Sequence, residues 1–356
     1  MEKTKRNSNI ELLRIFCMFF LILHHCTLHG GAVLMETHIN KEIALFFIPA
    51  GKIAFDTFIA ISMYFLVDQS FRAKKFLKIW ILVLFYSVLF TLVSIILGSK
   101  ISFGSILASF FPIIGNAHGF AAAYLAFYLF IPFLYKISTQ LSKFQIKWII
   151  TVLFICEIAT QMFGSITGYF QILYNELILF ILCYFISLYL KRYPWKILNN
   201  KLVLIIIVIC IYGLRYSITY IQTDSFICQK IFYFINANIG DESSIFNIVA
   251  GYALFYYFIN LKVPNSKIIN KIATIAFPVL LIHDHNVFRS AIWSVVYKCQ
   301  TWYYSSYFLL LLFAVAISIY IAAYCIEYFR RKIIEEPLLK NSLIEKYCER
   351  IDTLIN

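Results

Sequence analysis

Charged side chains are scarce in this sequence. Asp, Glu, Lys and Arg make up 14% of the 356 residues, whereas a soluble domain has roughly 25%. Hydrophobic residues reach 62%, and the mean hydropathy is +0.80. This composition excludes a disordered chain and an ordinary water-soluble enzyme. We therefore expect an integral membrane protein built as an all-α, polytopic helix bundle.

Paired cysteine motifs and long polar segments are also missing. The nine cysteines lie mostly inside apolar stretches and no CxxC pair occurs, which argues against a zinc site and a disulfide framework. No low-complexity tract and no convincing internal repeat is found, and no appended soluble domain is expected, so residues 1–356 are interpreted as one membrane domain. Many transporters carry repeated halves, so the missing repeat counts against a transporter.

What the sequence does contain is a series of apolar runs, each about 17–25 residues long and bounded by charged or turn residues. The predicted membrane spans are 10–29, 43–67, 76–97, 119–138, 148–163, 169–190, 201–221, 246–261, 272–296 and 303–326. The first run is too long for a signal peptide and contains Arg14 and His25, so it is interpreted as a retained span.

The basic residues predict the orientation of these ten spans. The net charge is +13, which in a soluble chain would suggest a nucleic-acid partner. Here the basic residues fall in the short gaps between apolar runs, so no nucleic-acid partner is expected. With the N-terminus inside, the cytoplasmic segments hold 23 Lys and Arg and the outer loops hold four. This predicts a multi-pass protein of the bacterial cell membrane with both termini and the tail 327–356 in the cytoplasm.

Ionisable residues inside a membrane span are costly, so each is a functional candidate. The first span contains Arg14 and His25, eleven residues apart, which places them on one helix face about 16.5 Å apart along the axis. Glu11 lies three residues before Arg14 and is expected to pair with it. The alternative is that Arg14 extends to the cytoplasmic headgroups and His25 bonds a neighbouring helix.

The segment NIELLRIFCMFFLILHHCTLHGG at 9–31 resembles the first helix of the acyltransferase-3 family of bacterial membrane O-acyltransferases, whose signature is Arg, ten residues and His. GKIAFDTFIAISMYFLV at 51–67 is similar to the family's second helix. FRAKKFLKIW at 71–80 resembles its basic loop, with Lys in place of Arg.

Three further segments are similar to later parts of that family: HGFAAAYLAFYLFIPFLYKI at 118–137, ATIAFPVLLIHDH at 273–285 and RRKIIEEPLLK at 330–340. The middle of the chain, 140–270, matches the family in hydropathy only. The resemblance therefore covers most of the chain in order.

The resemblance implies transfer of an acyl group, commonly acetyl, from cytoplasmic acyl-CoA (acetyl-CoA or another acyl-CoA) to a carbohydrate hydroxyl at the outer face. It implies that His25 acts as the general base or as a transient acyl-carrying nucleophile. Arg14 and the basic-loop residues Lys74, Lys75 and Lys78 would hold the phosphates of acyl-CoA. The alternative for the three lysines is that they only set the orientation.

Asp56 is a carboxylate in an otherwise apolar span. We expect it to orient an imidazole of the first span; the alternative is a pair with Lys52, four residues earlier. His118, His283 and Asp284 are acceptor-side candidates, or else polar groups at the wet ends of helices. A metal is not expected, because His283, Asp284 and His285 on one helix point in divergent directions.

Three other functions are compatible with a polytopic membrane protein. A transporter or flippase would use Arg14, Asp56 and His25 as a polar relay and would consume no acyl-CoA. A lipid-linked glycan polymerase or ligase would need a large catalytic outer loop, for which 222–245 is a poor candidate. A membrane scaffold would give no reason for the alignment of Arg14 with His25. The acceptor sugar, the length of the acyl group and homo-oligomer formation are not fixed by the sequence.

Overall fold

The computed structural model describes residues 7–115, 117–167, 176–220 and 244–356. Within these ranges the chain folds into helices joined by turns, with no strand, which confirms the all-α prediction. Six described helices are long and apolar enough to cross a membrane: Ser8–His29, Ile39–Leu66, Ala73–Ile96, Gly119–Gln140, Lys201–Ile218 and Phe308–Leu339. The count of ten spans and the cytoplasmic termini stay predictions.

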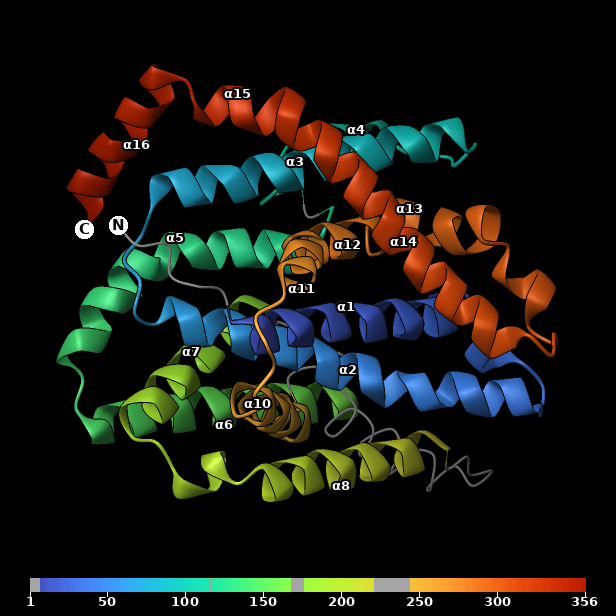
Figure 1. The fold of residues 1–356 in the computed structure, drawn as a ribbon, viewed down its shortest axis with the longest axis horizontal. Helices are drawn as coiled ribbons and strands as arrows, with labels where there is room; N and C mark the ends of the chain where they lie inside the picture. Colours follow the sequence, from blue (N-terminus) through green and yellow to red (C-terminus); the bar gives the residue numbers. More distant parts are fainter. Residues whose placement is uncertain (1–6, 116, 168–175, 221–243) are drawn as a thin grey trace. The chain divides into compact units, whose positions relative to one another are not determined.

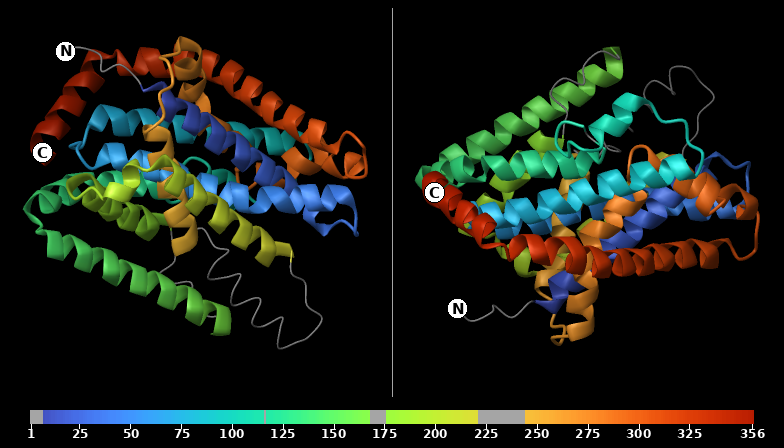
Figure 2. Two further views of the ribbon diagram at one scale, coloured as in Figure 1. Left: turned by 60° about the horizontal axis from the view of Figure 1, so that its bottom comes forward. Right: turned by 90° about the horizontal axis from the view of Figure 1, so that it is seen from above.

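The helices, drawn as ribbons in Figures 1 and 2, belong to two compact units. The first unit comprises residues 1–28, 32–67 and 141–274. Its helices are α1 (Ser8–His29), α2 (Ile39–Leu66), α6 (Lys143–Thr167), α7 (Glu176–Arg192), α8 (Lys201–Tyr220), α10 (Ile245–Ile259) and α11 (Lys267–Ile272). The predicted sixth span includes 169–175, which lie outside the described residues.

Helix α2 is the centre of the first unit, because α7, α8 and α10 all pack against it. In Figure 1 α10 is seen nearly end-on while α2 runs across the view, so the two helices cross steeply. Gly251 permits this crossing. A Cβ atom at Gly251 would lie 2.9 Å from the carbonyl carbon and from the Cβ of Asp56. The backbone of α10 therefore rests directly on the turn of α2 that carries Asp56.

The second unit comprises residues 29–31, 68–140 and 275–356. Its helices are α3 (Ala73–Ile96), α4 (Phe103–Ala108), α5 (Gly119–Gln140), α12 (Ala276–His283), α13 (Phe288–Ala291), α14 (Phe308–Arg330), α15 (Glu336–Leu339) and α16 (Ser342–Ile355). Two π-helical turns, Ile292–Val296 and Arg331–Glu335, continue α13 and α14. Helix α3 is central here, since α5, α12, α13 and α16 contact it.

The C-terminal helix α16 caps the start of α3 (Figure 2, right, red beside cyan). The Asp352 carboxylate accepts a hydrogen bond of 2.6 Å from the backbone N–H of Ala73, and Asn356 bonds both the N–H and the carbonyl of Phe71. The first N–H groups of a helix have no partner within it, so Asp352 supplies a cap from far along the chain. The opposite face of α16 leaves Leu343, Tyr347 and Leu354 exposed.

The predicted span 272–296 is a broken helix. Helix α12 ends at His283, and the chain turns before α13 begins at Phe288. The imidazole of His285 explains the break, since its Nδ1 accepts hydrogen bonds from the backbone N–H groups of Val287 and Phe288. The N–H of Asn286 donates to the carbonyl of Ala117, at 2.9 Å. These partners replace the bonds that a continuous helix would make.

Many exposed side chains on the long helices are large and apolar. Examples are Ile206 on α8, Phe133 on α5 and Leu310 on α14, each about half exposed or more. Contiguous apolar surface of this kind is rare on water-soluble monomers. It suits the hydrocarbon of a bilayer, so the long apolar helices are those of a membrane protein.

Candidate functional site

Helix α1 carries the two residues with which the site begins, Arg14 and His25. It runs without a break from Ser8 to His29, so the predicted alignment on one face follows from regular helix geometry. The Arg14 side chain is 28% exposed, and His25 is half-buried. A cation and an imidazole thus stand on one line along the helix, in two different surroundings.

Glu11 and Arg14 form the expected ion pair, with an N–O distance of 2.8 Å. The guanidinium carbon also lies 6.0 Å from the centre of the Phe65 ring on α2. Such a cation–π contact stabilises a guanidinium in an apolar setting. Arg14 therefore lies between a carboxylate and an aromatic ring.

The histidine next to His25 sets the contact between α1 and α2. His24 is 2% exposed, and a Cβ atom at Gly51 would lie 2.2 Å from the Cβ of His24. Only glycine allows this approach. The His24 and His25 rings are themselves 5.3 Å apart between centroids, so the packing at Gly51 also fixes where His25 stands.

Asp56 follows Gly51 on α2 and is 1% exposed. Removing a carboxylate from water is costly, so its burial marks a group with a structural or chemical task. The close approach of Gly251 on α10 leaves Asp56 no room to move its backbone. Its role in orienting an imidazole stays a prediction, as does a pair with Lys52.

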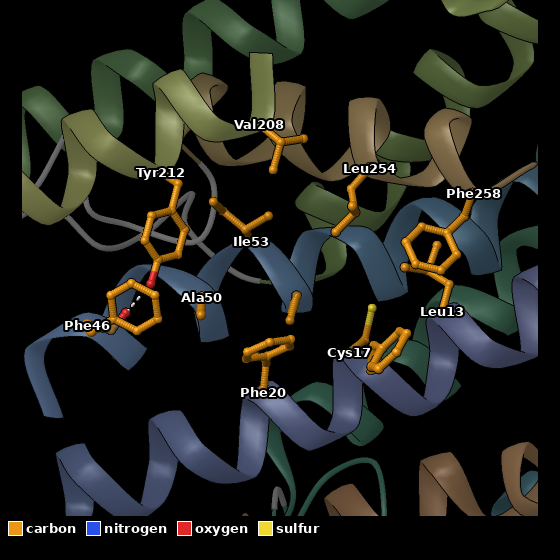
Figure 3. Close-up of a pocket in the computed structure, with 12 residues that line it drawn as sticks. Leu13, Cys17, Phe20, Phe46, Ala50, Ile53, Val208, Tyr212, Leu254 and Phe258 are labelled. Carbon is orange, nitrogen blue, oxygen red and sulfur yellow. Dashed lines mark hydrogen bonds between the residues drawn. The ribbon is translucent and has the colours of Figure 1, made fainter. Parts of the chain in front are cut away.

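A cavity of about 440 Å³ lies between α1, α2, α8 and α10 of the first unit (Figure 3). Such a volume is in the range of small-molecule sites, roughly 300–1,000 Å³. The lining is apolar and comprises Leu13, Phe16, Cys17, Phe20, Phe46, Ala50, Ile53, Ala54, Val208, Tyr212, Leu254 and Phe258. The hydroxyl of Tyr212 donates a hydrogen bond to the carbonyl of Phe46.

In the second unit, the three lysines predicted to bind acyl-CoA stand at the start of α3, and each has a protein partner. Lys74 pairs with Glu345 of α16 at 2.7 Å, and Lys78 pairs with Glu335 at 2.8 Å. Lys75 donates to Gln69 at 3.1 Å and lies 5.6 Å from the centre of the Tyr128 ring. The side chains of Lys74 and Lys78 remain about half exposed.

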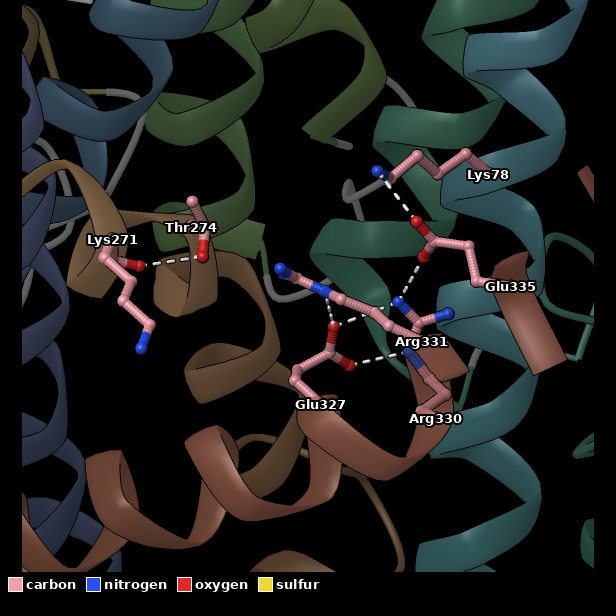
Figure 4. A network of polar contacts seen from close by, with 7 residues as sticks. All are labelled: Lys78, Lys271, Thr274, Glu327, Arg330, Arg331 and Glu335. Carbon is pink, nitrogen blue, oxygen red and sulfur yellow. Dashed lines mark hydrogen bonds and ion pairs between the residues drawn. The ribbon is translucent and has the colours of Figure 1, made fainter. Parts of the chain in front are cut away.

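Lys78 belongs to a larger ion network at the end of α14 (Figure 4). Arg330, whose side chain is 1% exposed, donates to Glu327 and to Glu335, while Arg331 donates to Glu327 at 2.9 Å. The π turn at Arg331–Glu335 brings Glu335 back toward Arg330. The network contains three cations and two carboxylates, so its net charge is +1, and one of the three cations is Lys78 of the basic loop.

The predicted acceptor-side residues gather around the middle of α3. His283 donates from Nδ1 to the carbonyl of Val279 at 2.6 Å, because a carbonyl can only accept. This fixes the tautomer, so that in the neutral ring Nε2 is the basic nitrogen. Asp284 pairs with Arg289 at 3.2 Å.

His118 and His285 are in ring contact, with centroids 4.7 Å apart. His285 donates from Nε2 to the carbonyl of Ser87 at 3.2 Å and is thereby occupied in holding the 284–287 turn. Burial, and to a lesser degree the neighbouring His285 ring, holds the pKa of His118 well below its usual value. Ser87 follows Lys74 by 13 residues, which is about 20 Å along α3.

A family model described as an acyltransferase domain matches residues 7–327. The chain belongs to the acyltransferase-3 family. Comparison with curated proteins and with solved structures finds no match. The family match covers nearly the whole chain and confirms the resemblance read from the sequence.

In this acyltransferase the predicted residues fall into three groups. Glu11, Arg14, His25 and Asp56 lie in the first unit; Lys74, Lys75 and Lys78 lie at one end of α3 in the second unit; and His118, His283 and Asp284 lie near its middle. The cationic and the histidine-bearing groups of the second unit are therefore separated along one helix.

Sequence reasoning missed the buried ion network of this acyltransferase. The signal was present in RRKIIEEPLLK, where two adjacent arginines precede two adjacent glutamates. On a regular α-helix, Arg330 and Glu335 are five residues apart and do not face each other. The π turn alters that spacing, which is why the pair was not foreseen. The Arg215–Asn247 bond between α8 and α10 was missed because the two residues lie 32 positions apart.

Proposed function

We propose that the chain is a membrane O-acyltransferase that moves an acetyl group from cytoplasmic acetyl-CoA to a hydroxyl of an extracytoplasmic or lipid-linked carbohydrate. The observation that carries this proposal is membership of the acyltransferase-3 family together with Arg14 and His25 at the family's spacing on one face of an unbroken α1. Capsule, exopolysaccharide, lipopolysaccharide and wall glycans all offer hydroxyls of this type.

His25 is the proposed base. A sugar hydroxyl has a pKa far above 7, so it must lose its proton as its oxygen attacks the thioester carbonyl. A half-buried imidazole can accept that proton, and the CoA thiolate leaves and is reprotonated in turn. The alternative role, an acyl-histidine intermediate, uses the same nitrogen as a nucleophile. Buried Asp56 would orient the imidazole.

Arg14, Lys74, Lys75 and Lys78 are the proposed acyl-CoA contacts. Arg14 contacts Glu11 and Phe65, and a guanidinium oriented in this way favours recognition of a phosphate or carbonyl over simple charge attraction. Lys74 and Lys78 keep about half of their side-chain surface exposed. Lys78 accounts for the one surplus positive charge of the ion network that it forms with Arg330, and this charge supports an anionic ligand there.

His118, His283 and Asp284 are the proposed acceptor contacts. His283 is oriented through Nδ1, which leaves Nε2 as the nitrogen suited to a sugar hydroxyl. Asp284 is paired with Arg289, and both are part-exposed. Imidazole and carboxylate groups can form the hydrogen bonds that a saccharide needs.

The test is acyl transfer by the full chain in lipid nanodiscs, given radiolabelled acetyl-CoA and a lipid-linked glycan extract. We expect label in the glycan with the wild type and a loss of at least 100-fold, about 2.7 kcal/mol, in His25→Ala. His38→Ala is the matched control, because His38 caps α2 through Asn40 and takes no part in the proposed chemistry. Label that persists in His25→Ala would contradict the role of His25.

A wild type that consumes no acetyl-CoA with any glycan would contradict the proposed reaction itself. The polar relay of a transporter or flippase would then be the better account, and vesicles would show substrate accumulation without acyl transfer.

A further inference from the structure

The apolar cavity of the first unit is not used by the proposed chemistry. Its α1 lining is Leu13, Phe16, Cys17 and Phe20, and the centre of this set lies about 120° around the helix from the line that joins Arg14 and His25. An acyl-CoA held along that line would not place its acyl group in the cavity. The cavity therefore belongs to a second molecule.

The occupant must be a hydrocarbon chain. The lining is made of aliphatic, aromatic and thiol side chains, and the one hydroxyl among them, that of Tyr212, is already bonded to the Phe46 carbonyl. A polar solute would lose its hydrogen bonds to water and regain none. Phe16 and Phe46 are nearly half exposed, so the cavity opens on the surface of helices that are apolar enough to span a membrane.

Beyond one end of the cavity lies the cationic side chain of Arg215. On α8, Val208, Tyr212 and Arg215 follow at intervals of four and three and share a face, and on α10 Asn247 shares a face with Leu254 and Phe258. Arg215 donates to the side-chain oxygen of Asn247, so the two lining faces meet there. The guanidinium of Arg215 is thus the cationic group at this end, and Arg215 is only 3% exposed.

An apolar cavity that ends at a buried guanidinium fits an amphiphile with a long chain and an anionic head. Guanidinium groups bind phosphate in a bidentate manner. The predicted orientation puts this end of α8 toward the outer face. We propose that the cavity binds the isoprenoid chain of a lipid-linked acceptor, with the phosphate that joins chain and saccharide at Arg215. The identification as acceptor rests on the proposed function.

The first experiment measures binding in nanodiscs, independently of any reaction. The probe is a short polyprenyl phosphate with a diazirine at the end of its chain, and crosslinked peptides are mapped by mass spectrometry. We expect labelling of α1, α2 and α10, reduced at least tenfold in Ala50→Phe, whose side chain would fill the cavity. Val208→Phe fills the cavity from α8, so it tests the same prediction if Ala50→Phe fails to fold.

Gly213→Phe is the matched control. Gly213 is exposed, next to Tyr212 in the sequence, and a Cβ atom there would meet no atom within 4 Å. It adds the same ring outside the cavity, and labelling should stay as in the wild type. Arg215→Gln should weaken binding of polyprenyl phosphate about tenfold and leave binding of the uncharged polyprenol unchanged, and Arg215→Lys should recover part of the loss.

Labelling elsewhere, or equal labelling of wild type and both filling variants, would overturn the proposal. So would a diazirine-bearing phospholipid that competes as well as the polyprenyl phosphate, because the cavity would then hold an ordinary bilayer lipid. A chain that binds the probe in the cavity but transfers no acetyl group would overturn the proposed function and leave the binding site standing.

Discussion

The side chain of His24 lies against the backbone of Gly51, so close that a methyl group on Gly51 would come within 2.2 Å of the His24 Cβ. This contact joins the helix of Arg14 and His25 to the helix of Asp56. It is the tightest constraint that the described residues place on the proposed chemistry of the first unit.

Gly51→Ala should therefore destabilise the first unit by about 2–3 kcal/mol, the cost of overpacking, and reduce acyl transfer at least tenfold by displacing His25. Thermal unfolding in detergent and the transfer assay measure the two effects. Gly213→Ala is the control, since its Cβ meets open space; there a gain of about 0.5–1 kcal/mol is expected from the better helix former. Equal behaviour of the two variants would contradict the packing argument.

A second prediction concerns the effect of Lys74 and Lys78 on the KM for acetyl-CoA. If they hold the phosphates of acetyl-CoA, Lys74→Gln and Lys78→Gln should each raise KM for acetyl-CoA about three- to tenfold with little change in kcat, more strongly at low salt. Lys340→Gln removes a comparable exposed ion pair with Glu336 in the tail and should leave KM unchanged. A fall in melting temperature with no change in KM would mean that the lysines only pair with α16 and Glu335.

We expect two cations of the ion network, Arg330 and Lys78, to contribute unequally to the stability of the protein. Arg330→Met leaves Glu327 and Glu335 without their buried partner and should cost about 3–5 kcal/mol. Lys78→Met removes a half-exposed partner and should cost about 1 kcal/mol or less. Chemical denaturation of the two variants, each in the same detergent, compares them. Equal losses would show that the burial of Arg330 does not govern its contribution.

Because His118 is buried, we expect the protein to lose stability in mild acid. Burial keeps the pKa of His118 well below its ordinary value of 6.5, so the unfolded chain takes up a proton in a pH range where the native chain does not. Stability is complete above pH 6.5 and declines as the pH falls below it. Melting curves between pH 8 and pH 5 should show this decline, and His118→Gln should make it shallower. An unchanged slope in the variant would assign the effect to other groups.

The cap on α3 gives a fifth prediction. Asp352→Ala removes the acceptor for the N–H of Ala73 and should cost about 1 kcal/mol. Hydrogen exchange at the first turn of α3 should quicken, while Asp352→Asn, which keeps an acceptor oxygen, should restore protection. Exchange that is the same in all three chains would contradict the role of α16 as a cap.

The helices could be predicted from the sequence because their signal is local. Long apolar runs bounded by charge gave α1, α2, α3, α5 and α14 to within a few residues. The pairing of Glu11 with Arg14 was foreseeable for the same reason, since it lies within one helical turn. The family assignment rested on motifs spread along the chain, and the family model confirms it.

The rest depends on neighbours that the sequence does not reveal. The break after α12 depends on the Nδ1 of His285 and on the carbonyl of Ala117. Ala117 is far from this segment in the sequence, so its contribution could not be predicted. The cavity exists because small and large side chains from four helices leave a gap between them. The Gly251 contact with Asp56 joins residues almost two hundred positions apart.

Helix α16 has one further consequence. Its inward face holds the start of α3 through Asp352 and Glu345, and its outward face presents Leu343, Tyr347 and Leu354. We expect a helix with such a stripe to rest in the headgroup layer of a bilayer. Lys74 would then lie at the depth where lipid phosphates meet water. A bilayer rich in anionic lipid would in that case compete with any phosphate-bearing ligand of Lys74.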